Sequence, residues 1–143
     1  MDAMQQHALK QADPKYKQFT TKIQSAHRAR SRTNTQQCVT MRQIVNLQAS
    51  LDLTRRKSWD FEDTSGEVDK VLEDKTGEDG ESWFWTYHNA GEEIEKLMIQ
   101  KCIKVANLAA QYDMFTEQIA SLNEEQDKYG DKLVAKAKAK EDN

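Results

Sequence analysis

Turn-forming residues are scarce in this sequence. The chain of 143 residues contains one proline and five glycines, whereas a fold built from many short strands needs such residues at most of its turns. The scarcity argues against an all-β fold and favours long helices. Three tryptophans, four tyrosines and four phenylalanines supply more apolar surface than an intrinsically disordered chain usually carries. We therefore expect a folded all-α protein.

Cysteines and long apolar runs are also scarce. Cys38 and Cys102 are the two cysteines, too few for a disulfide framework and too far apart for a CxxC metal or redox site. No apolar stretch approaches the roughly 18 residues of a membrane-spanning helix. The first residues also lack the apolar core of a secretory signal. These absences predict a soluble, cytoplasmic protein.

The patterns that mark catalytic and cofactor sites are absent as well. The chain has no GxSxG, P-loop or GxGxxG motif, and its three histidines are too widely separated to share one face of a helix as metal ligands. The acidic stretch over residues 74–81 fails as a calcium loop, because Asp79 and Trp85 stand where Gly and Glu are needed. We expect no enzymatic activity, catalytic residue, metal, cofactor or small-molecule substrate.

Charge is distributed in three blocks. Residues 1–57 contain eleven Lys or Arg against three Asp, residues 60–82 contain ten Asp or Glu against two Lys, and residues 83–143 carry a net charge of −3. The simplest interpretation is a basic helix beside an acidic one in the same molecule. The alternative is a basic helical module that binds phosphate on nucleic acid or on an anionic membrane surface. Its candidate phosphate-binding residues are Lys15, Lys17, Lys22, Arg28 and Arg32.

A first long helix is predicted from about residue 14 to residue 57. Asp13 is a good N-cap, Pro14 is tolerated in the first turn, and no further Gly or Pro occurs before Gly66. The apolar positions step by three and four residues, as the buried face of a helix requires. The expected buried residues are Tyr16, Phe19, Ile23, Ala26, Cys38, Met41, Ile44, Val45, Leu47 and Leu51.

A second long helix is predicted over about residues 82–133, because a heptad repeat runs unbroken over residues 91–133. Ten of its thirteen a and d positions are apolar, which is typical of a coiled coil or helical bundle. Residues 134–143 alternate Ala with Lys and should form a solvated C-terminal tail. The a and d residues are Gly91, Ile94, Met98, Lys101, Val105, Leu108, Tyr112, Phe115, Ile119, Leu122, Gln126, Tyr129 and Leu133.

The two helices should pack as an elongated antiparallel helical hairpin, coiled-coil-like, in a single domain over residues 1–133. The connector, about residues 58–81, is acidic and contains three glycines and a short helix candidate that Thr64 and Glu67 would open as a capping box. With a bend near residue 70, facing residues should have numbers that sum to about 140.

Two groups of apolar residues remain for a partner. Residues 82–88, SWFWTYH, bring four aromatics together, either as a cap on the hairpin end or as a binding hot spot. The second helix also has apolar residues away from its heptad seam, which predicts burial on several faces. The candidate partner-binding residues are Trp83, Phe84, Trp85, Tyr87, Leu97, Ile99 and Ile103. We predict a coiled-coil adaptor or assembly subunit of a larger complex, which binds partner helices or a second copy of itself.

Overall fold

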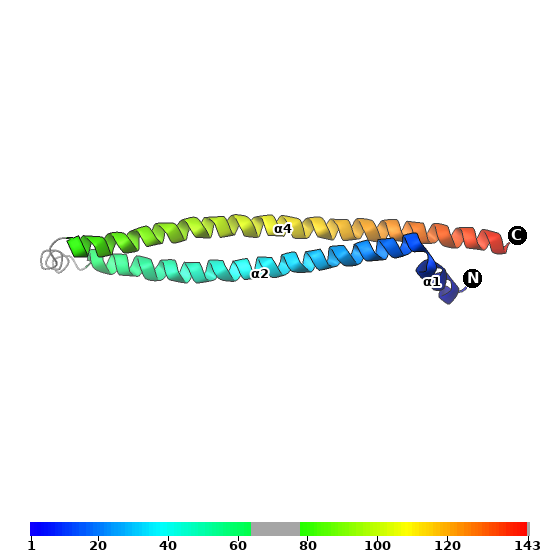
Figure 1. Cartoon of the computed structure of the whole chain (residues 1–143), viewed down its shortest axis with the longest axis horizontal. Helices are drawn as coiled ribbons and strands as arrows, with labels where there is room; N and C mark the ends of the chain where they lie inside the picture. The colour runs from blue at the N-terminus through cyan, green and yellow to red at the C-terminus, as the bar shows by residue number, and fades with distance from the viewer. Residues whose placement is uncertain (64–77, 143) are drawn as a thin grey trace. The chain divides into compact units, whose positions relative to one another are not determined.

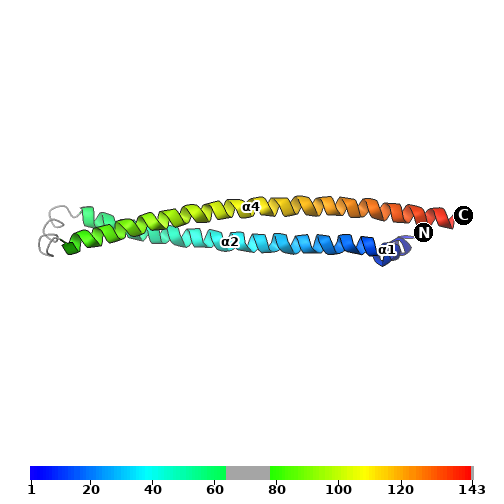
Figure 2. The same ribbon diagram turned by 45° about the horizontal axis from the view of Figure 1, so that its top comes forward.

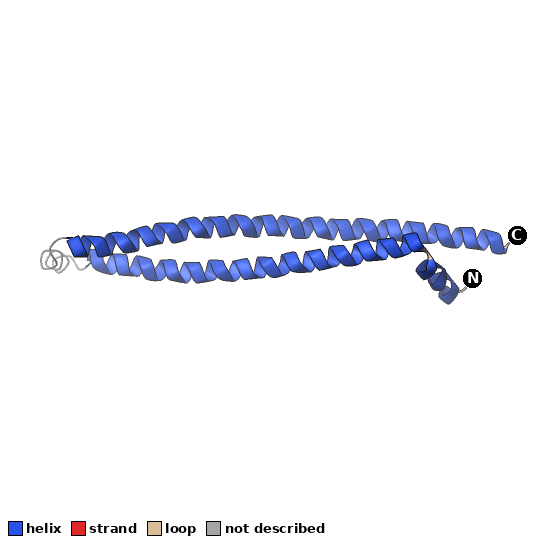
Figure 3. Ribbon diagram, in the orientation of Figure 1, coloured by secondary structure: helices blue, strands red, loops and turns tan. Residues whose placement is uncertain are grey.

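The computed structural model describes residues 1–63 and 78–142, and it places them in three helices (Figure 1). α1 spans Ala3–Ala12, α2 spans Pro14–Asp63 and α4 spans Glu78–Glu141. The described residues contain no strand (Figure 3), and the two long helices pack against each other. The prediction of an all-α helical hairpin is confirmed.

Both long helices extend beyond their predicted bounds. α2 continues past residue 57 to Asp63, and α4 begins at Glu78 and not at about residue 82. Helix therefore occupies both ends of the stretch that we predicted as a connector, and it includes Gly80, because one Gly costs a helix only about 1 kcal/mol. The predicted short acidic helix, with its capping box at Thr64 and Glu67, lies outside the described residues.

Aspartates begin the first two helices. The Asp2 carboxylate accepts a hydrogen bond from the Gln5 N–H at 2.8 Å, and the Gln5 side chain accepts one from the Asp2 N–H at 3.0 Å, which completes a capping box. Asp13 is extended and accepts a hydrogen bond from the Tyr16 N–H at 3.0 Å. The predicted break at Asp13-Pro14 is confirmed, because Pro14 has no N–H with which to continue α1.

The chain forms two compact units. Unit 1 consists of Met1–Gln36 and Leu108–Asn143, and unit 2 consists of Gln37–Asn107. In each unit a length of α2 lies beside a length of α4, as both ribbon views show (Figures 1 and 2).

In unit 1, Tyr129 of α4 joins the start of α2. Its hydroxyl donates a hydrogen bond to the Asp13 carboxylate at 2.8 Å, and its ring centroid lies 6.0 Å from that of Phe19. The bonds from Tyr129 and from the Tyr16 N–H stabilise the carboxylate and lower the pKa of Asp13. The same bond to Asp13 favours the protonated phenol and raises the pKa of Tyr129.

Gln126 and Gly130 add a second close contact in unit 1. The Gln126 amide donates to the Thr20 hydroxyl at 2.7 Å and to the Tyr16 carbonyl at 3.3 Å. A Cβ at Gly130 would lie 3.0 Å from Cε of Lys10 and 3.2 Å from a ring carbon of Tyr16. The absence of a side chain at Gly130 therefore lets α1 and α2 approach α4 closely.

The heptad predicted for α4 is confirmed, because all thirteen of its a and d positions are buried or half-buried. Leu108 and Ile119 are among the most buried residues. Burial also continues beyond the predicted end, since Val134 is buried and Ala137 is half-buried. The stretch that we expected to be a solvated tail is thus helix with a buried side chain. Glu141, near its end, lies 3.9 Å from the N-terminal amine.

The seam of α2 differs from the prediction in its middle. Buried and half-buried positions step by three and four residues without interruption, but four consecutive steps fall on polar side chains. These four are Arg30, Thr33, Gln37 and Thr40. Thr40 is only 1% exposed, whereas Cys38, Met41 and Val45 are exposed. The prediction that these three are buried is wrong, because the apolar residues on either side hold the helix in a phase that turns them outward.

The two long helices are antiparallel and close to the predicted register. In unit 1 the bonded residues Asp13 and Tyr129 have numbers that sum to 142. In unit 2 the ion-paired residues Arg55 and Glu95 have numbers that sum to 150. The first sum agrees with the expected value of about 140, and the second, which joins two long side chains, exceeds it by about ten.

Candidate protein-interaction groove

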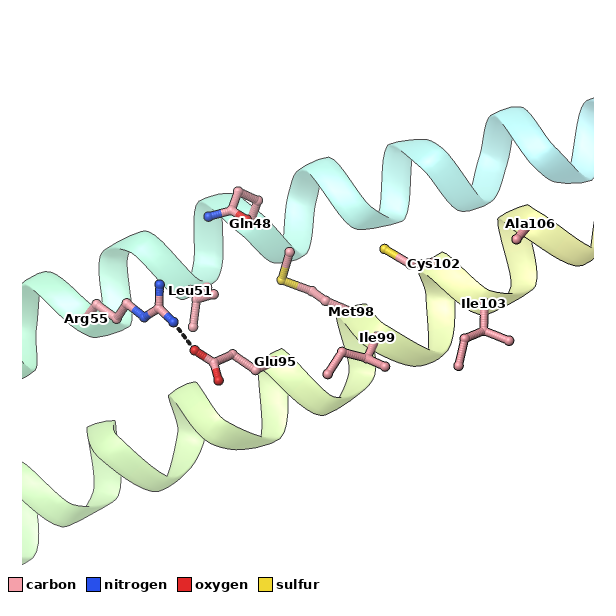
Figure 4. Close-up of a pocket in the computed structure, with 9 residues that line it drawn as sticks. All are labelled: Gln48, Leu51, Arg55, Glu95, Met98, Ile99, Cys102, Ile103 and Ala106. Carbon is pink, nitrogen blue, oxygen red and sulfur yellow. Dashed lines mark hydrogen bonds and ion pairs between the residues drawn. The ribbon is translucent and has the colours of Figure 1, made fainter. Parts of the chain in front are cut away.

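Unit 2 carries an open groove on one flank of its helix pair. Its floor consists of the seam residues Leu51 and Met98, and its rim consists of residues of both α2 and α4 that lie beside the seam (Figure 4). The groove has a volume of about 650 Å³. It is lined by Gln48, Leu51, Arg55, Glu95, Met98, Ile99, Cys102, Ile103 and Ala106.

The apolar rim of this groove is uncovered. Ile99 is 61% exposed and Ile103 is 57% exposed, although Leu51, which also lines the groove, is buried. Ile99 and Ile103 lie one helical turn apart, so their side chains are neighbours. Burying an isoleucine side chain stabilises a structure by about 1.5–3 kcal/mol. Two adjacent isoleucines left in water are therefore a favourable site for an apolar partner.

An ion pair closes one end of the groove. The Arg55 guanidinium donates to the Glu95 carboxylate, as the dashed line in Figure 4 shows. Both side chains are about half exposed, so this pair contributes little to the stability of the unit. The pair gives this end of the groove a cation and an anion beside an otherwise apolar surface. The Cys102 thiol is exposed and faces into the groove (Figure 4).

Only part of the predicted partner-binding set lies at this groove. Ile99 and Ile103 line it together, whereas Leu97, which is 40% exposed, lines two smaller grooves of about 320 and 330 Å³ that contain none of the residues of the large one. The side chains of four further candidates lie outside the described residues, although their backbone belongs to α4. These are Trp83, Phe84, Trp85 and Tyr87.

The sequence pattern did not identify two exposed apolar residues of unit 2 as candidates for partner binding. Met41 and Val45 of α2 are exposed and line a shallow groove of about 320 Å³ in unit 2. The apolar pattern of the sequence predicts both in the buried seam. The heptad phase of Ile23 and Ala26, when it is continued through the polar segment, places Thr40 on the seam and Met41 and Val45 beside the seam.

The candidate phosphate-binding residues all lie on α2 in unit 1, and all five are exposed. None of them forms an ion pair within the part of the chain that the structure describes. At about 100° per residue, Lys15 and Lys22 occupy one side of the helix, whereas Lys17, Arg28 and Arg32 occupy another. The Lys15 ammonium lies 4.9 Å from the centre of the Tyr129 ring, a cation–π contact. The five cations therefore do not converge on one pocket.

Comparison with family models, with curated proteins and with solved structures finds no match to this chain. Across residues 1–63 and 78–142, no group of three or more His, Cys, Asp or Glu residues could hold a metal ion. No helix in these ranges has an apolar stretch long enough to cross a bilayer. Function is therefore argued from the geometry of the groove.

Proposed function

We propose that this chain is a non-catalytic coiled-coil subunit that assembles with helical protein partners through the groove of unit 2. One observation carries the proposal: Ile99 and Ile103 are exposed side by side on the rim of an open apolar groove. Binding of an amphipathic helix to such a groove is a recurrent mode of recognition, in which apolar residues three and four positions apart serve as anchors. A cytoplasmic adaptor or assembly role accords with this chemistry.

The energetics support a protein partner. Covering more than half of two isoleucine side chains would contribute about 2–3 kcal/mol, at roughly 1.5–3 kcal/mol for each fully buried residue. The half-buried Met98 and the exposed Ala106 would add further apolar contact. These contributions are those of a small set of anchors, which is how protein interfaces obtain most of their affinity.

The alternative is a basic module that binds nucleic acid or an anionic membrane through Lys15, Lys17, Lys22, Arg28 and Arg32. It is favoured by the exposure of all five side chains and by the lack of ion pairs to them within the described residues. Their division between two sides of α2 favours a solvated helix face instead, because a phosphate backbone is bound by cations on one face.

The proposal is tested by the size of the assembly that contains the tagged full chain in a cell extract. We expect the wild-type chain to elute well above its monomer mass, and we expect Ile99→Glu and Ile103→Glu to shift it to monomer size. Each glutamate would place a charge on apolar surface that the partner has to desolvate. Leu97→Glu is the matched control, because it adds the same charge to the same helix outside the groove.

Two results would contradict the proposal: a wild-type chain that elutes as a monomer, or an assembly that survives both groove variants. The alternative is tested separately by binding to generic duplex DNA and to anionic vesicles at low and high salt. Salt-sensitive binding that is lost on reversing the charge of Lys17, Arg28 and Arg32 would favour the basic module.

A further inference from the structure

We infer that the groove of unit 2 is occupied by the same flank of a second copy of this chain, so that two copies form a four-helix bundle. This inference rests on the proposed function and names the partner. In the bundle the two copies are related by a two-fold axis that runs along the helices. α2 of each copy then lies beside α4 of the other copy, antiparallel to it and at the same level.

The first argument is that both helices of unit 2 present a second stripe on the flank that holds the groove. These residues lie at the two heptad positions next to the seam, spaced by three and four residues like the seam itself. On α2 the stripe consists of Met41, Val45, Gln48, Asp52 and Arg55. On α4 it consists of Glu92, Glu95, Ile99, Cys102 and Ala106, with Ile103 next to Ile99 at its outer edge. We call these two sets the groove stripes.

The second argument is that the groove stripes match in size at the apolar end. The Arg55–Glu95 pair relates the levels of the two helices, and counting back from it by equal steps places Val45 close to the level of Ala106, with Met41 about one turn beyond it. In the proposed bundle, the larger Val45 of α2 therefore lies against the small Ala106 of α4 from the other copy. Alternation of large and small side chains is what allows helices to pack closely.

The third argument is charge complementarity at the other end. The groove stripe of α2 ends at Arg55, which Arg56 follows in the sequence. At the level of Arg55, the groove stripe of α4 contains Glu92 and Glu95. Arg55 already pairs with Glu95 of its own chain, but both side chains remain about half exposed and have room for a further partner. A two-fold axis along the helices places Arg55 beside the acidic residues of the second copy twice over. A two-fold axis perpendicular to the helices would turn the second copy end for end, so the charged ends of the stripes in the two copies would not meet.

The extent of the groove stripes predicts a weak dimer. From Met41 to Arg55 the stripe covers about 21 Å of helix at 1.5 Å per residue, across a width of two helices of about 10 Å each. Two such surfaces amount to about 800 Å² in projection, below the roughly 1,200 Å² at which stable interfaces begin and in the range of weak, transient ones. We expect dissociation in the micromolar range, so the dimer should depend visibly on protein concentration.

The experiment is sedimentation velocity of the purified full chain from about 5 µM to about 200 µM, where a micromolar dimer passes from mostly monomer to mostly dimer. At the highest concentration, the measured mass should approach that of a dimer, which is twice the 16.5 kDa of one chain. Ile99→Glu and Ile103→Glu should weaken dimerisation by at least tenfold, and Leu97→Glu should leave it within about twofold. Circular dichroism of each variant verifies that it remains helical.

A charge exchange tests the arrangement itself. Arg55→Glu alone places two carboxylates together across the interface, and Glu95→Arg alone places two guanidiniums together, so each variant should dimerise weakly. Mixing the two variants restores opposite charges between the chains while the charges within each chain remain alike. We therefore expect the mixture to form heterodimers with an affinity near that of the wild type.

The outcomes separate the inference from the proposed function. A purified chain that stays monomeric at about 200 µM, while groove variants still disrupt its assembly in extract, overturns the second copy as occupant and leaves the proposed function standing. A dimer that is indifferent to Ile103→Glu, or a mixture of charge variants that fails to associate, also overturns the inference. Groove variants without effect in either experiment overturn both.

Discussion

Replacing each of two helical glycines by alanine should have opposite consequences. Gly91 lies in unit 2 and Gly130 lies in unit 1, and both are buried within α4. Gly→Ala inside a helix normally stabilises a protein by about 1 kcal/mol, because alanine loses less backbone entropy on folding. The surroundings of each new methyl group decide whether that gain is kept.

At Gly91 the gain should be kept. An added Cβ would lie 3.7 Å from Cδ1 of Leu51 and 3.8 Å from Cγ2 of Thr54, which are ordinary van der Waals distances. We expect Gly91→Ala to raise the free energy of unfolding by about 1 kcal/mol and the melting temperature by about 4 °C.

At Gly130 the gain should be lost. The Cβ would lie 3.0 Å from Cε of Lys10, which can swing away, and 3.2 Å from a ring carbon of Tyr16, which is held in the packed start of α2. Overpacking of this kind costs about 1–3 kcal/mol. We expect Gly130→Ala to range from neutral to about 2 kcal/mol destabilising, once the helix gain of about 1 kcal/mol is subtracted.

Thermal and urea unfolding followed by circular dichroism measure both variants against the wild type, all at one protein concentration, because dimerisation shifts apparent stability. Equal stabilisation by the two substitutions would refute the close approach at Gly130. Destabilisation by Gly91→Ala would refute the packing of Leu51 and Thr54 around that position.

Three further predictions concern unit 1. Removing residues 134–143 should lower the melting temperature by several degrees, because it exposes the surface that Val134 covers; a truncation that retains Val134 is the control, and equal losses would contradict this reasoning. Leu108→Asp buries a charge in the seam and should cost more than about 3 kcal/mol in urea unfolding, so an unchanged midpoint would refute the register. The lowered pKa of Asp13 stabilises the fold above the carboxyl's ordinary pKa, and this contribution disappears as the pH falls towards the lowered value. The raised pKa of Tyr129 stabilises below the ordinary phenol pKa, and this contribution disappears as the pH rises through the raised value. Tyr129→Phe should flatten both limbs of the stability–pH curve, and a curve identical to that of the wild type would show that the bond is not formed.

Local signals in the sequence determined the helices of this protein. Asp13-Pro14 marks a helix boundary by itself, because an N-cap carboxylate and a residue without an N–H act within one turn. The heptad over residues 91–133 likewise determines the buried face of α4, because its apolar residues leave one phase available. Such signals were predictable because they do not depend on distant parts of the chain.

The tertiary structure decided what the apolar pattern left ambiguous. In α2, Cys38, Met41 and Val45 form a second apolar stripe beside the seam, and only packing against α4 showed that Thr40 is buried and Met41 is exposed. Val134 is buried although its local sequence resembles a solvated tail.

Ile99, Ile103 and Leu97 are equally apolar in sequence, yet the first two share a groove and the third lies outside it. The physical reason is that a helix face becomes a core, a groove or an open surface only through the neighbour placed against it. That neighbour comes from residues about 50 positions away in the chain, beyond the reach of any local pattern.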